Sequence, residues 1–287
     1  MPALYRAATI ATDIACNTLG RRRVVRISRL VYLRARRDTP NGLDGNGERN
    51  LQGWIMSLSS PGEPLHVVDV GANIGQWSTA MLNAARLTDR LDDLDLHAFE
   101  PSLYTFGRLS ETLSGQRVIL RQAALGESAG TSVLYVIEQG SSTNSLYKLP
   151  WAPKDSGTEE VMVTTLDRYV DQNGLDHLTL VKIDTEGNEI AVLRGARSLL
   201  ASQRISVIQF EYNRLWVCSR SFLRDAFELL LPFGYQLGKL SARGIEFYSG
   251  WDSDLETFVQ SNYVACPPNV AQSLPTVSWW KTGEKLV

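Results

Sequence analysis

Two periodicities alternate along the chain from residue 65 onward. Short runs rich in Val, Ile and Leu predict buried strands, and the segments between them carry apolar residues at the three- and four-residue spacing of amphipathic helices. The predicted strands are residues 65–70, 94–99, 117–125, 178–184 and 205–212. The predicted helices are residues 76–87, 103–113, 188–202 and 220–234. Because repeated strand–helix units form parallel sheets, we predict an α/β fold whose mostly parallel sheet is covered by helices on both faces.

Residues 131–166 interrupt this alternation. Two strand-like runs, 131–138 and 159–166, flank a loop that contains Ser, Gly and Pro. Two short extended runs also occur near the end of the chain, at 235–241 and 244–249. Because of its polarity and its place after the third strand, we expect the loop to fold over a bound substrate. The residues expected to offer hydrogen bonds there are Ser142, Thr143 and Asn144.

The first 60 residues have a different character. Helix-like spacing at 2–19 and 23–36 precedes a polar loop at 38–48, and the segment up to Arg37 holds nine arginines and a single acidic residue. We therefore divide the chain into a basic, mainly helical extension (1–60) and a main domain (61–287). The arginines are compatible with a solvated helix surface. Peripheral contact with an anionic membrane is the alternative, and the absence of a groove-reading motif argues against nucleic acid.

The composition is that of a soluble globular protein, with 44% hydrophobic and 21% charged residues in 287 and a net charge of -2. Three cysteines, far apart and without C-x-x-C spacing, argue against a disulfide framework or a zinc site. No apolar run approaches the roughly 20 residues that span a bilayer, and the N-terminus lacks the pattern of a signal peptide. We expect a cytoplasmic protein.

A glycine-containing turn follows the first predicted strand, in the stretch VVDVGANIG. Gly71 permits a tight exit from the strand, and Gly75 allows a ligand or backbone to approach closely. Dinucleotide sites use G-x-G-x-x-G to place a pyrophosphate at the helix N-terminus, but here Asn73 replaces the second glycine. The turn therefore suits a ligand with an amino-acid group, which Asp69 would meet electrostatically.

Glu100 ends the next predicted strand. An acidic residue at this position accepts hydrogen bonds from both ribose hydroxyls of a nucleoside, although the dipole of the following helix would also favour a carboxylate here. The glycine-containing turn and the carboxylate of Glu100 follow neighbouring strands at the same edge of the sheet, and together they indicate a nucleoside ligand. The missing pyrophosphate turn then favours S-adenosylmethionine over NAD.

Carboxylates gather in the stretch LVKIDTEGNE, where a strand gives way to a helix. Asp184, Glu186 and Glu189 follow Lys182, and Glu211 closes the next strand. Ligands bind beyond the carboxyl ends of parallel strands, so these groups lie near the reacting centre. Some of them would equally cap the following helix. Such a cluster can bind a hard cation, but we predict no metal ion.

Six stretches occur in the order seen in the FkbM-like family of S-adenosylmethionine-dependent methyltransferases. They are VVDVGANIGQWS, HAFEPS, QAALGES, GSSTNSL, TTLDRYV and LVKIDTEGNEIAVLRGA. The resemblance covers roughly residues 65–212. It implies a class I (Rossmann-like) methyltransferase fold, a seven-stranded sheet whose last strand is antiparallel, and methylation of a hydroxyl on a sugar or polyketide-type secondary metabolite.

The resemblance also implies roles for individual residues. The methionine and ribose end of the cofactor would be lined by Asp69, Gly71, Asn73 and Gly75. Glu100 would hold the ribose with help from Ser102, and Gln122 and Ala123, at the end of the third strand, would lie near the adenine. Asp184 would face the methyl-transfer site.

The acceptor hydroxyl needs to lose its proton, and a general base contributes roughly 10²–10⁴-fold to such a step. Each histidine lies in a strand or at the wrong end of one, which indicates a structural or solvated role. These are His66, His97 and His177. We therefore hypothesise a carboxylate base, first Asp184 and then Glu211 or Glu186. The remaining alternatives are N- or C-methylation, a catalytically silent cofactor-binding scaffold in a biosynthetic complex, and an NAD-dependent oxidoreductase.

Overall fold

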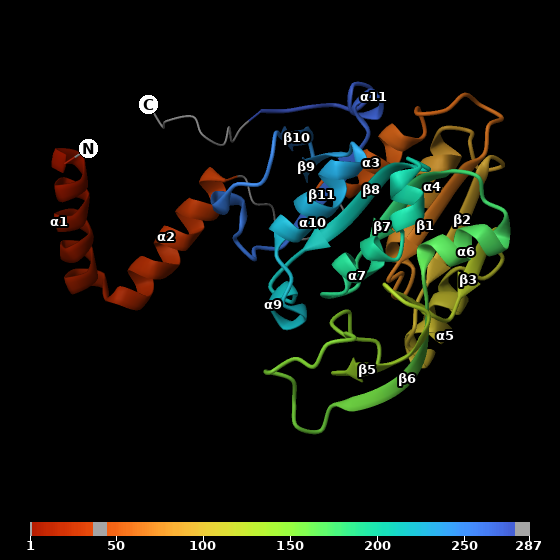
Figure 1. The fold of residues 1–287 in the computed structure, drawn as a ribbon. Helices are drawn as coiled ribbons and strands as arrows, with labels where there is room; N and C mark the ends of the chain where they lie inside the picture. Colours follow the sequence, from red (N-terminus) through yellow and green to blue (C-terminus); the bar gives the residue numbers. More distant parts are fainter. Residues whose placement is uncertain (1, 37–44, 279–287) are drawn as a thin grey trace. The chain divides into compact units, whose positions relative to one another are not determined.

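The computed structural model describes residues 2–36 and 45–278, and it divides into two compact units, Met1–Thr39 and Pro40–Val287 (Figure 1). The smaller unit consists of helices α1 (Pro2–Leu19) and α2 (Arg21–Ala35), close to the predicted bounds. The polar loop predicted at 38–48 lies mostly outside the described residues. Among the described helices, none is both long enough and apolar enough to cross a bilayer.

An eight-stranded mixed sheet forms the centre of the larger unit, in the order β10-β9-β11-β8-β7-β1-β2-β3. Its strands are β1 (Leu65–Val70), β2 (Leu94–Phe99), β3 (Val118–Arg121), β7 (Leu178–Ile183), β8 (Ile205–Tyr212), β9 (Gln236–Ser241), β10 (Gly244–Tyr248) and β11 (Ser261–Cys266). Five strands, β3, β2, β1, β7 and β8, run parallel to one another, whereas β11 is antiparallel to β8 and β9, and β10 is antiparallel to β9.

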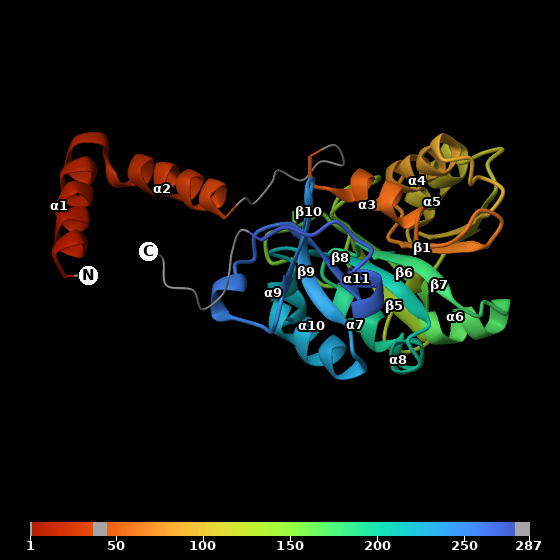
Figure 2. The ribbon, with the colours of Figure 1, turned by 90° about the horizontal axis from the view of Figure 1, so that it is seen from above.

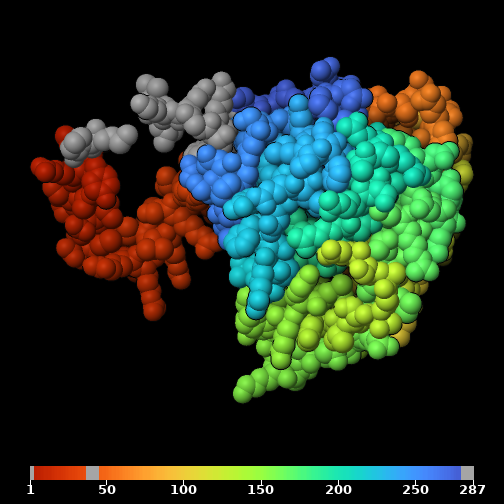
Figure 3. Space-filling model, viewed as in Figure 1, coloured from red at the N-terminus to blue at the C-terminus, as the bar shows by residue number. Residues whose placement is uncertain are grey.

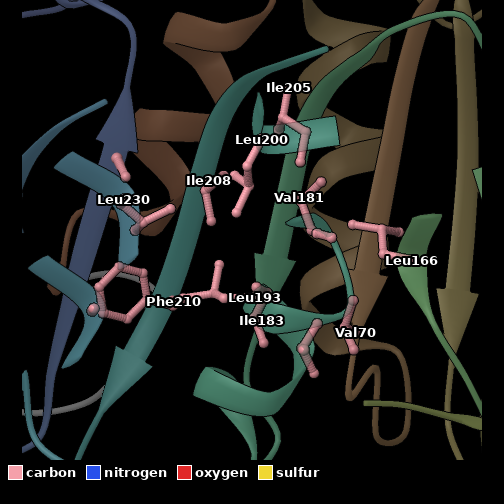
Figure 4. Packing of buried hydrophobic residues seen from close by; sticks show 14 of the residues in the cluster. Val70, Leu166, Val181, Ile183, Leu193, Leu200, Ile205, Ile208, Phe210 and Leu230 are labelled. Atoms are coloured by element: carbon pink, nitrogen blue, oxygen red, sulfur yellow. The ribbon is translucent and has the colours of Figure 1, made fainter. Parts of the chain in front are cut away.

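Helices cover both faces of this sheet, as predicted (Figure 2). One face packs against α3 (Glu48–Ile55), α4 (Gln76–Leu87), α5 (Leu103–Thr112) and α11 (Pro268–Ala271). The other packs against α6 (Leu166–Asn173), α7 (Glu189–Arg194), α8 (Arg197–Ala201), α9 (Trp216–Ser219) and α10 (Leu223–Leu230). Two 3-10 turns, Leu231–Phe233 and Ser253–Leu255, complete the helical elements. Figure 4 shows Val181, Ile183 and Phe210 of the sheet among the buried side chains of the second face.

The sheet has eight strands and not seven, which corrects the prediction. The last strand, β11, is antiparallel as implied, but it was not recognised in the sequence and inserts between β8 and β9. The extended runs at 235–241 and 244–249 form the hairpin of β9 and β10, and β10 adds the eighth strand at the edge.

A second, three-stranded sheet contains β4 (Ala124–Leu125), β5 (Gly130–Val136) and β6 (Gly157–Thr164). The strand predicted at 117–125 is therefore wrong as one element, because β3 pairs with β2 whereas β4 pairs with β6. Figure 1 places β5 and β6 at the end of the larger unit toward which β7 and β8 run, and Figure 3 shows residues 130–164, yellow to green, forming that end of its surface.

The helix predicted at 188–202 is also two elements. α7 ends at Arg194 and α8 begins at Arg197. Gly195, between them, lies directly against the backbone of another segment of the same chain: a Cβ added to it would be 2.0 Å from the carbonyl oxygen of Gly126. The carboxylate of Asp167 then accepts hydrogen bonds from the backbone amides of Ser198 and Leu199 at the start of α8. A helix break at such a tertiary contact cannot be predicted from the spacing of the apolar residues.

The segment before β1 is part of the larger unit. Leu51 and Ile55 of α3 are fully buried among the side chains of α4 and the sheet. The guanidinium of Arg90 donates to the backbone carbonyls of Met56, Ser59 and Glu63, which holds the link between α3 and β1 in place. The larger unit therefore includes α3, which a boundary at residue 60 assigns to the extension.

A buried ion pair joins the carboxyl-terminal halves of β1 and β7. The Lys182 Nζ atom lies 3.0 Å from Asp69 Oδ1 and 3.5 Å from Asp184 Oδ2, and it donates to the carbonyl of Gly71 at 3.2 Å. The other oxygen of Asp69 accepts from the hydroxyl of Ser78 at 2.7 Å. Burial alone would lower the pKa of Lys182, but the surrounding carboxylates raise it above its ordinary value, so the lysine is charged.

Replacing Gly195 by alanine tests the tight contact that separates α7 from α8. Alanine favours helix by itself, yet at this position the Cβ collides with backbone, and we expect Gly195→Ala to lower the free energy of unfolding by about 1–3 kcal/mol. Gly107, within α5, is the matched control because nothing lies within 4 Å of its added Cβ. Gly107→Ala should stabilise by about 0.5–1 kcal/mol in the same urea titration. Equal changes in the free energy of unfolding for the two substitutions would show that the close approach of Gly195 to Gly126 does not restrict this position to glycine.

Removing the cation of the buried pair should be strongly destabilising. Lys182→Met leaves the fully buried Asp69 without its counter-charge, and we expect a loss of about 3–5 kcal/mol in the free energy of unfolding. The control is Arg224→Met, which breaks an exposed pair with Glu228 on α10 and should leave the free energy of unfolding nearly unchanged. A loss at Lys182 no larger than that at Arg224 would show that the buried pair contributes little.

Candidate active site

The turn after β1 is pressed against the end of β7. Gly71 has a φ of +79°, and a Cβ on it would lie 1.9 Å from the carbonyl oxygen of Asp184, so only glycine fits. Asn73 and Gly75 continue with φ of +50° and +87°, and Gly75 precedes the first residue of α4. These positive angles turn the chain sharply and place the start of α4 at the edge of the sheet where ligands bind.

Glu100 meets this turn, as its position at the end of β2 predicts. Its carboxylate accepts from the backbone amide of Asn73 at 3.1 Å and from that of Ser102 at 3.0 Å. Burial raises the pKa of Glu100 to about 7, and the charge of Asp69 adds to the increase, while the hydrogen bonds and Lys182 oppose it. A carboxylate that titrates near neutrality therefore lies at the mouth of the turn.

The other expected cofactor contacts lie on either side of Glu100. The Ser102 side chain is buried, and its hydroxyl donates to Glu159 of β6 at 3.3 Å. Gln122 and Ala123 do not end a strand: they form the two-residue link between β3 and β4, with Gln122 exposed and Ala123 half-buried. Asp69 lies fully buried beneath the turn, where Lys182 and Ser78 occupy its carboxylate.

Three predicted catalytic carboxylates come together at the carboxyl ends of β7 and β8. Oxygen atoms of Asp184, Glu186 and Glu211 all lie within 4.8 Å of one another. Burial raises the pKa of Glu186 to about 8 and raises the pKa of Glu211 well above its ordinary value, and the negative charge of Asp184 contributes to both shifts. Such a cluster has the chemistry of a proton acceptor and of a hard-cation site.

Asn213 connects two of these carboxylates and was missed in the sequence. Its amide nitrogen donates to Glu186 at 3.1 Å and to Glu211 at 2.5 Å. Gln260, just before β11, donates to the other oxygen of Glu211 at 2.8 Å. The signal for Asn213 was its place directly after β8. No local pattern marks Gln260, which depends on the unrecognised strand.

Glu189 has the structural role that was the alternative for this carboxylate. It is fully buried, and its carboxylate accepts from the backbone amides of Thr185 and Gly187, at 2.8 and 3.0 Å. These bonds fix the turn between β7 and α7, in which Glu186 adopts a φ of +55°. Glu189 therefore shapes the backbone that presents Asp184 and Glu186.

The loop between β5 and β6 reaches this turn through a residue next to those expected. Ser145 donates its hydroxyl to the carbonyl of Glu186 at 2.7 Å. Asn144 is turned into the loop, where its oxygen accepts from the amide of Ile137, and Thr143 pairs with Ser141. Ser142 is exposed. The loop thus lies beside the carboxylates, held there by Ser145.

The histidines lie away from the cluster of Asp184, Glu186 and Glu211. His66 and His97 share Asp95 near the amino ends of β1 and β2. The Nδ1 atom of His66 and the Nε2 atom of His97 each lie 3.0 Å from its Oδ2 atom. His177 precedes β7, where its ring bonds to the hydroxyl of Ser206. Their positions fit the structural role expected of them. This group of two imidazoles and a carboxylate is packed through His97 against the hydroxyl of Tyr169.

Similar proteins are methyltransferases. A hexuronic acid methyltransferase from Haloferax volcanii is 23% identical over 166 residues, which cover 58% of this chain and 63% of that protein. Less than two thirds of that relative is therefore matched. Two solved structures are a precorrin-6y C5,15-methyltransferase from Geobacter metallireducens (14% identity, 76% of this chain and 86% of that one, TM-score 0.39) and an S-adenosylmethionine-dependent methyltransferase from Agrobacterium tumefaciens (12%, 77% and 62%, TM-score 0.40).

The model of the methyltransferase FkbM domain matches residues 69–237, more than half of the chain. The match begins at Asp69 beneath the turn and runs through the carboxylate cluster to β9, so it includes the turn, Glu100 and the three clustered carboxylates. The resemblance that the motifs indicated is thereby confirmed. The chain belongs to the FkbM family of methyltransferases, enzymes that take their methyl group from S-adenosylmethionine.

Proposed function

We propose that S-adenosylmethionine binds across the turn after β1, with its ribose on Glu100. Two features of the described residues support this place. Glu100 is already aimed at the turn through the amides of Asn73 and Ser102, and the side-chain oxygen of Asn73 is buried without a hydrogen-bond partner. Buried acceptors are normally satisfied, so a ligand donor such as the methionine ammonium suits this oxygen. Asp69 acts by holding the turn through Lys182.

We further propose that the acceptor is a hydroxyl of a sugar, glycoside or polyketide-type metabolite. The observation that carries this proposal is the meeting of Asp184, Glu186 and Glu211 beside the cofactor turn. A hydroxyl requires a proton acceptor, whereas an already nucleophilic amine needs less help. A hexuronic acid methyltransferase among the similar proteins adds support for a sugar. Membership of the family leaves the NAD-dependent oxidoreductase without support.

Bound S-adenosylmethionine supplies an electrophilic methyl group on its sulfonium, so the chain's own residues have to orient the acceptor and take its proton. Asp184 has 35% of its side chain exposed, and the ammonium of Lys182 lies 3.5 Å from its carboxylate. We assign it as the base: its carboxylate would accept the proton of the acceptor hydroxyl, whose oxygen would receive the methyl group that the cofactor supplies. Burial raises the pKa of Glu186 and of Glu211, which favours their neutral forms and limits the negative charge around the acceptor oxygen. Ser142 and Thr143 belong to the proposed acceptor loop, with Asn144 supporting its shape.

Cofactor affinity should depend on the titration of Glu100. Ribose hydroxyls donate to the ionised carboxylate, so binding favours the deprotonated form, and affinity should rise with pH through the pKa of about 7 and then level off. Glu100→Gln should bind S-adenosylmethionine about 10- to 100-fold more weakly at alkaline pH and lose this dependence. Calorimetry across this pH range measures both effects.

The control for this experiment is Glu111→Gln, which removes an exposed carboxylate of α5. It should leave both the affinity and its pH dependence unchanged. If Glu100→Gln retains the rise in affinity with pH, another group binds the ribose or controls binding. NAD in place of S-adenosylmethionine should give no heat.

Asp184→Asn should lower kcat by about 10²–10⁴-fold at nearly unchanged affinity for S-adenosylmethionine, because the amide cannot accept the proton. Turnover is measured with a panel of glycosides and lipid-linked sugars, with and without chelator, which also tests for a cation on the carboxylates. Asp171→Asn, an exposed aspartate of α6, is the matched control.

Full turnover by Asp184→Asn would remove Asp184 as the base. If Glu186→Gln instead abolishes activity, and the wild-type rate rises through pH 8, the base is Glu186. Cofactor binding without turnover of any acceptor would favour the silent scaffold.

A further inference from the structure

The two helices of the smaller unit expose an unusual amount of apolar surface. In α2, Val25, Ile27, Leu30 and Val31 are each more than half exposed, and none of the residues of this helix is buried. In α1 the exposed apolar side chains are Leu4, Tyr5, Ile10, Ile14 and Leu19. So many exposed apolar side chains on two helices indicate a binding surface, because isolated helices gain their stability from what they pack against.

One group of apolar residues and one group of arginines lie on different faces of α2, with Arg23 and Arg34 flanking the apolar group and Leu33 beside the basic one. Val24, Ile27 and Val31 are separated by three and four residues and therefore share one face. Arg22, Arg26 and Arg29 have the same spacing and share another. Up to Arg37 the chain contains nine arginines against the single acidic Asp13, so the surface is strongly cationic. Basic and apolar faces on one helix are typical of helices that lie in a membrane interface.

We propose that α1 and α2 bind the surface of an anionic lipid bilayer. The apolar face of α2 enters the boundary between headgroups and acyl chains, while its arginines pair with lipid phosphates and anionic headgroups. Arginine side chains reach the headgroup region from a partly inserted helix because their stems are apolar. No described helix can span the bilayer, so the contact is peripheral. Charge complementarity favours this occupant over a neutral protein, and the apolar face favours it over nucleic acid, which contacts arginines alone.

The test uses the full chain and vesicles of defined composition. Binding to vesicles of phosphatidylcholine is compared by cosedimentation with binding to vesicles in which phosphatidylserine replaces part of that lipid. We expect binding to the anionic vesicles only, weakened by salt. Since each arginine near such a surface contributes about five-fold to partitioning, Arg22→Gln/Arg26→Gln/Arg29→Gln should bind about 100-fold more weakly. The matched control, Arg117→Gln/Arg168→Gln/Arg243→Gln, removes the same charge from the larger unit and should bind like the wild type.

A second variant separates insertion from simple charge attraction. Ile27→Ala/Val31→Ala keeps every arginine and the helix propensity but removes apolar area, and we expect it to bind the same vesicles at least about tenfold more weakly. Three results would overturn the proposal: no vesicle binding by the wild type, equal losses in the two arginine variants, or Ile27→Ala/Val31→Ala converting a dimer to a monomer with lipid binding unchanged. The last would assign the face to a second copy of the chain.

Discussion

Lys182 is a cation held almost entirely out of water between the carboxyl ends of β1 and β7. It pairs with Asp69, approaches Asp184 and binds the carbonyl of Gly71, so one ammonium group ties a strand end, a turn and a neighbouring strand end together. A buried charge of this kind is stabilising only while its partners remain in place, because any unpaired member bears the full cost of desolvation. The position of Asp184 relative to the glycine-containing turn after β1 therefore depends on this cation.

The same charge organises the acidity of the site. Six carboxylates lie around the ends of β1, β2, β7 and β8, and their mutual repulsion has to be reduced for the fold to persist. Lys182 offsets part of it, and protons on the buried groups offset more, since burial raises the pKa values of Glu100, Glu189 and Glu186 to about 7, 7 and 8. The price of this arrangement is that the unfolded chain binds fewer protons than the native one between the ordinary and the raised pKa values, so their contribution to stability falls as the pH rises through that interval.

Much of this arrangement follows from the sequence. The alternation of strands and helices, the glycine turn, and the carboxylates at successive strand ends predict one ligand-binding edge, because register in a parallel sheet brings strand ends together. What could not be predicted depends on contacts between distant residues. Gly195 lies between α7 and α8 against the backbone of Gly126, β11 has no periodicity strong enough to distinguish it, and Asn213 matters only once Glu186 and Glu211 are neighbours. Asp69 was expected to meet the amino-acid group of the ligand, but the sequence could not show that it would instead be buried beneath the turn and paired with Lys182.

The proposed membrane contact and the proposed sugar acceptor bear on each other through concentration. A free glycoside reaches the carboxylates by diffusion from solution wherever the enzyme is. A sugar carried on a lipid is confined to a surface, and an enzyme bound to the same surface meets it at a much higher effective concentration. The arginines of α2 would then improve the apparent affinity for a lipid-linked acceptor without touching it, and would leave turnover of a soluble glycoside unchanged. Salt dependence therefore separates the two acceptor classes: screening should weaken methylation of the membrane-bound acceptor selectively, because only that reaction includes the surface attraction.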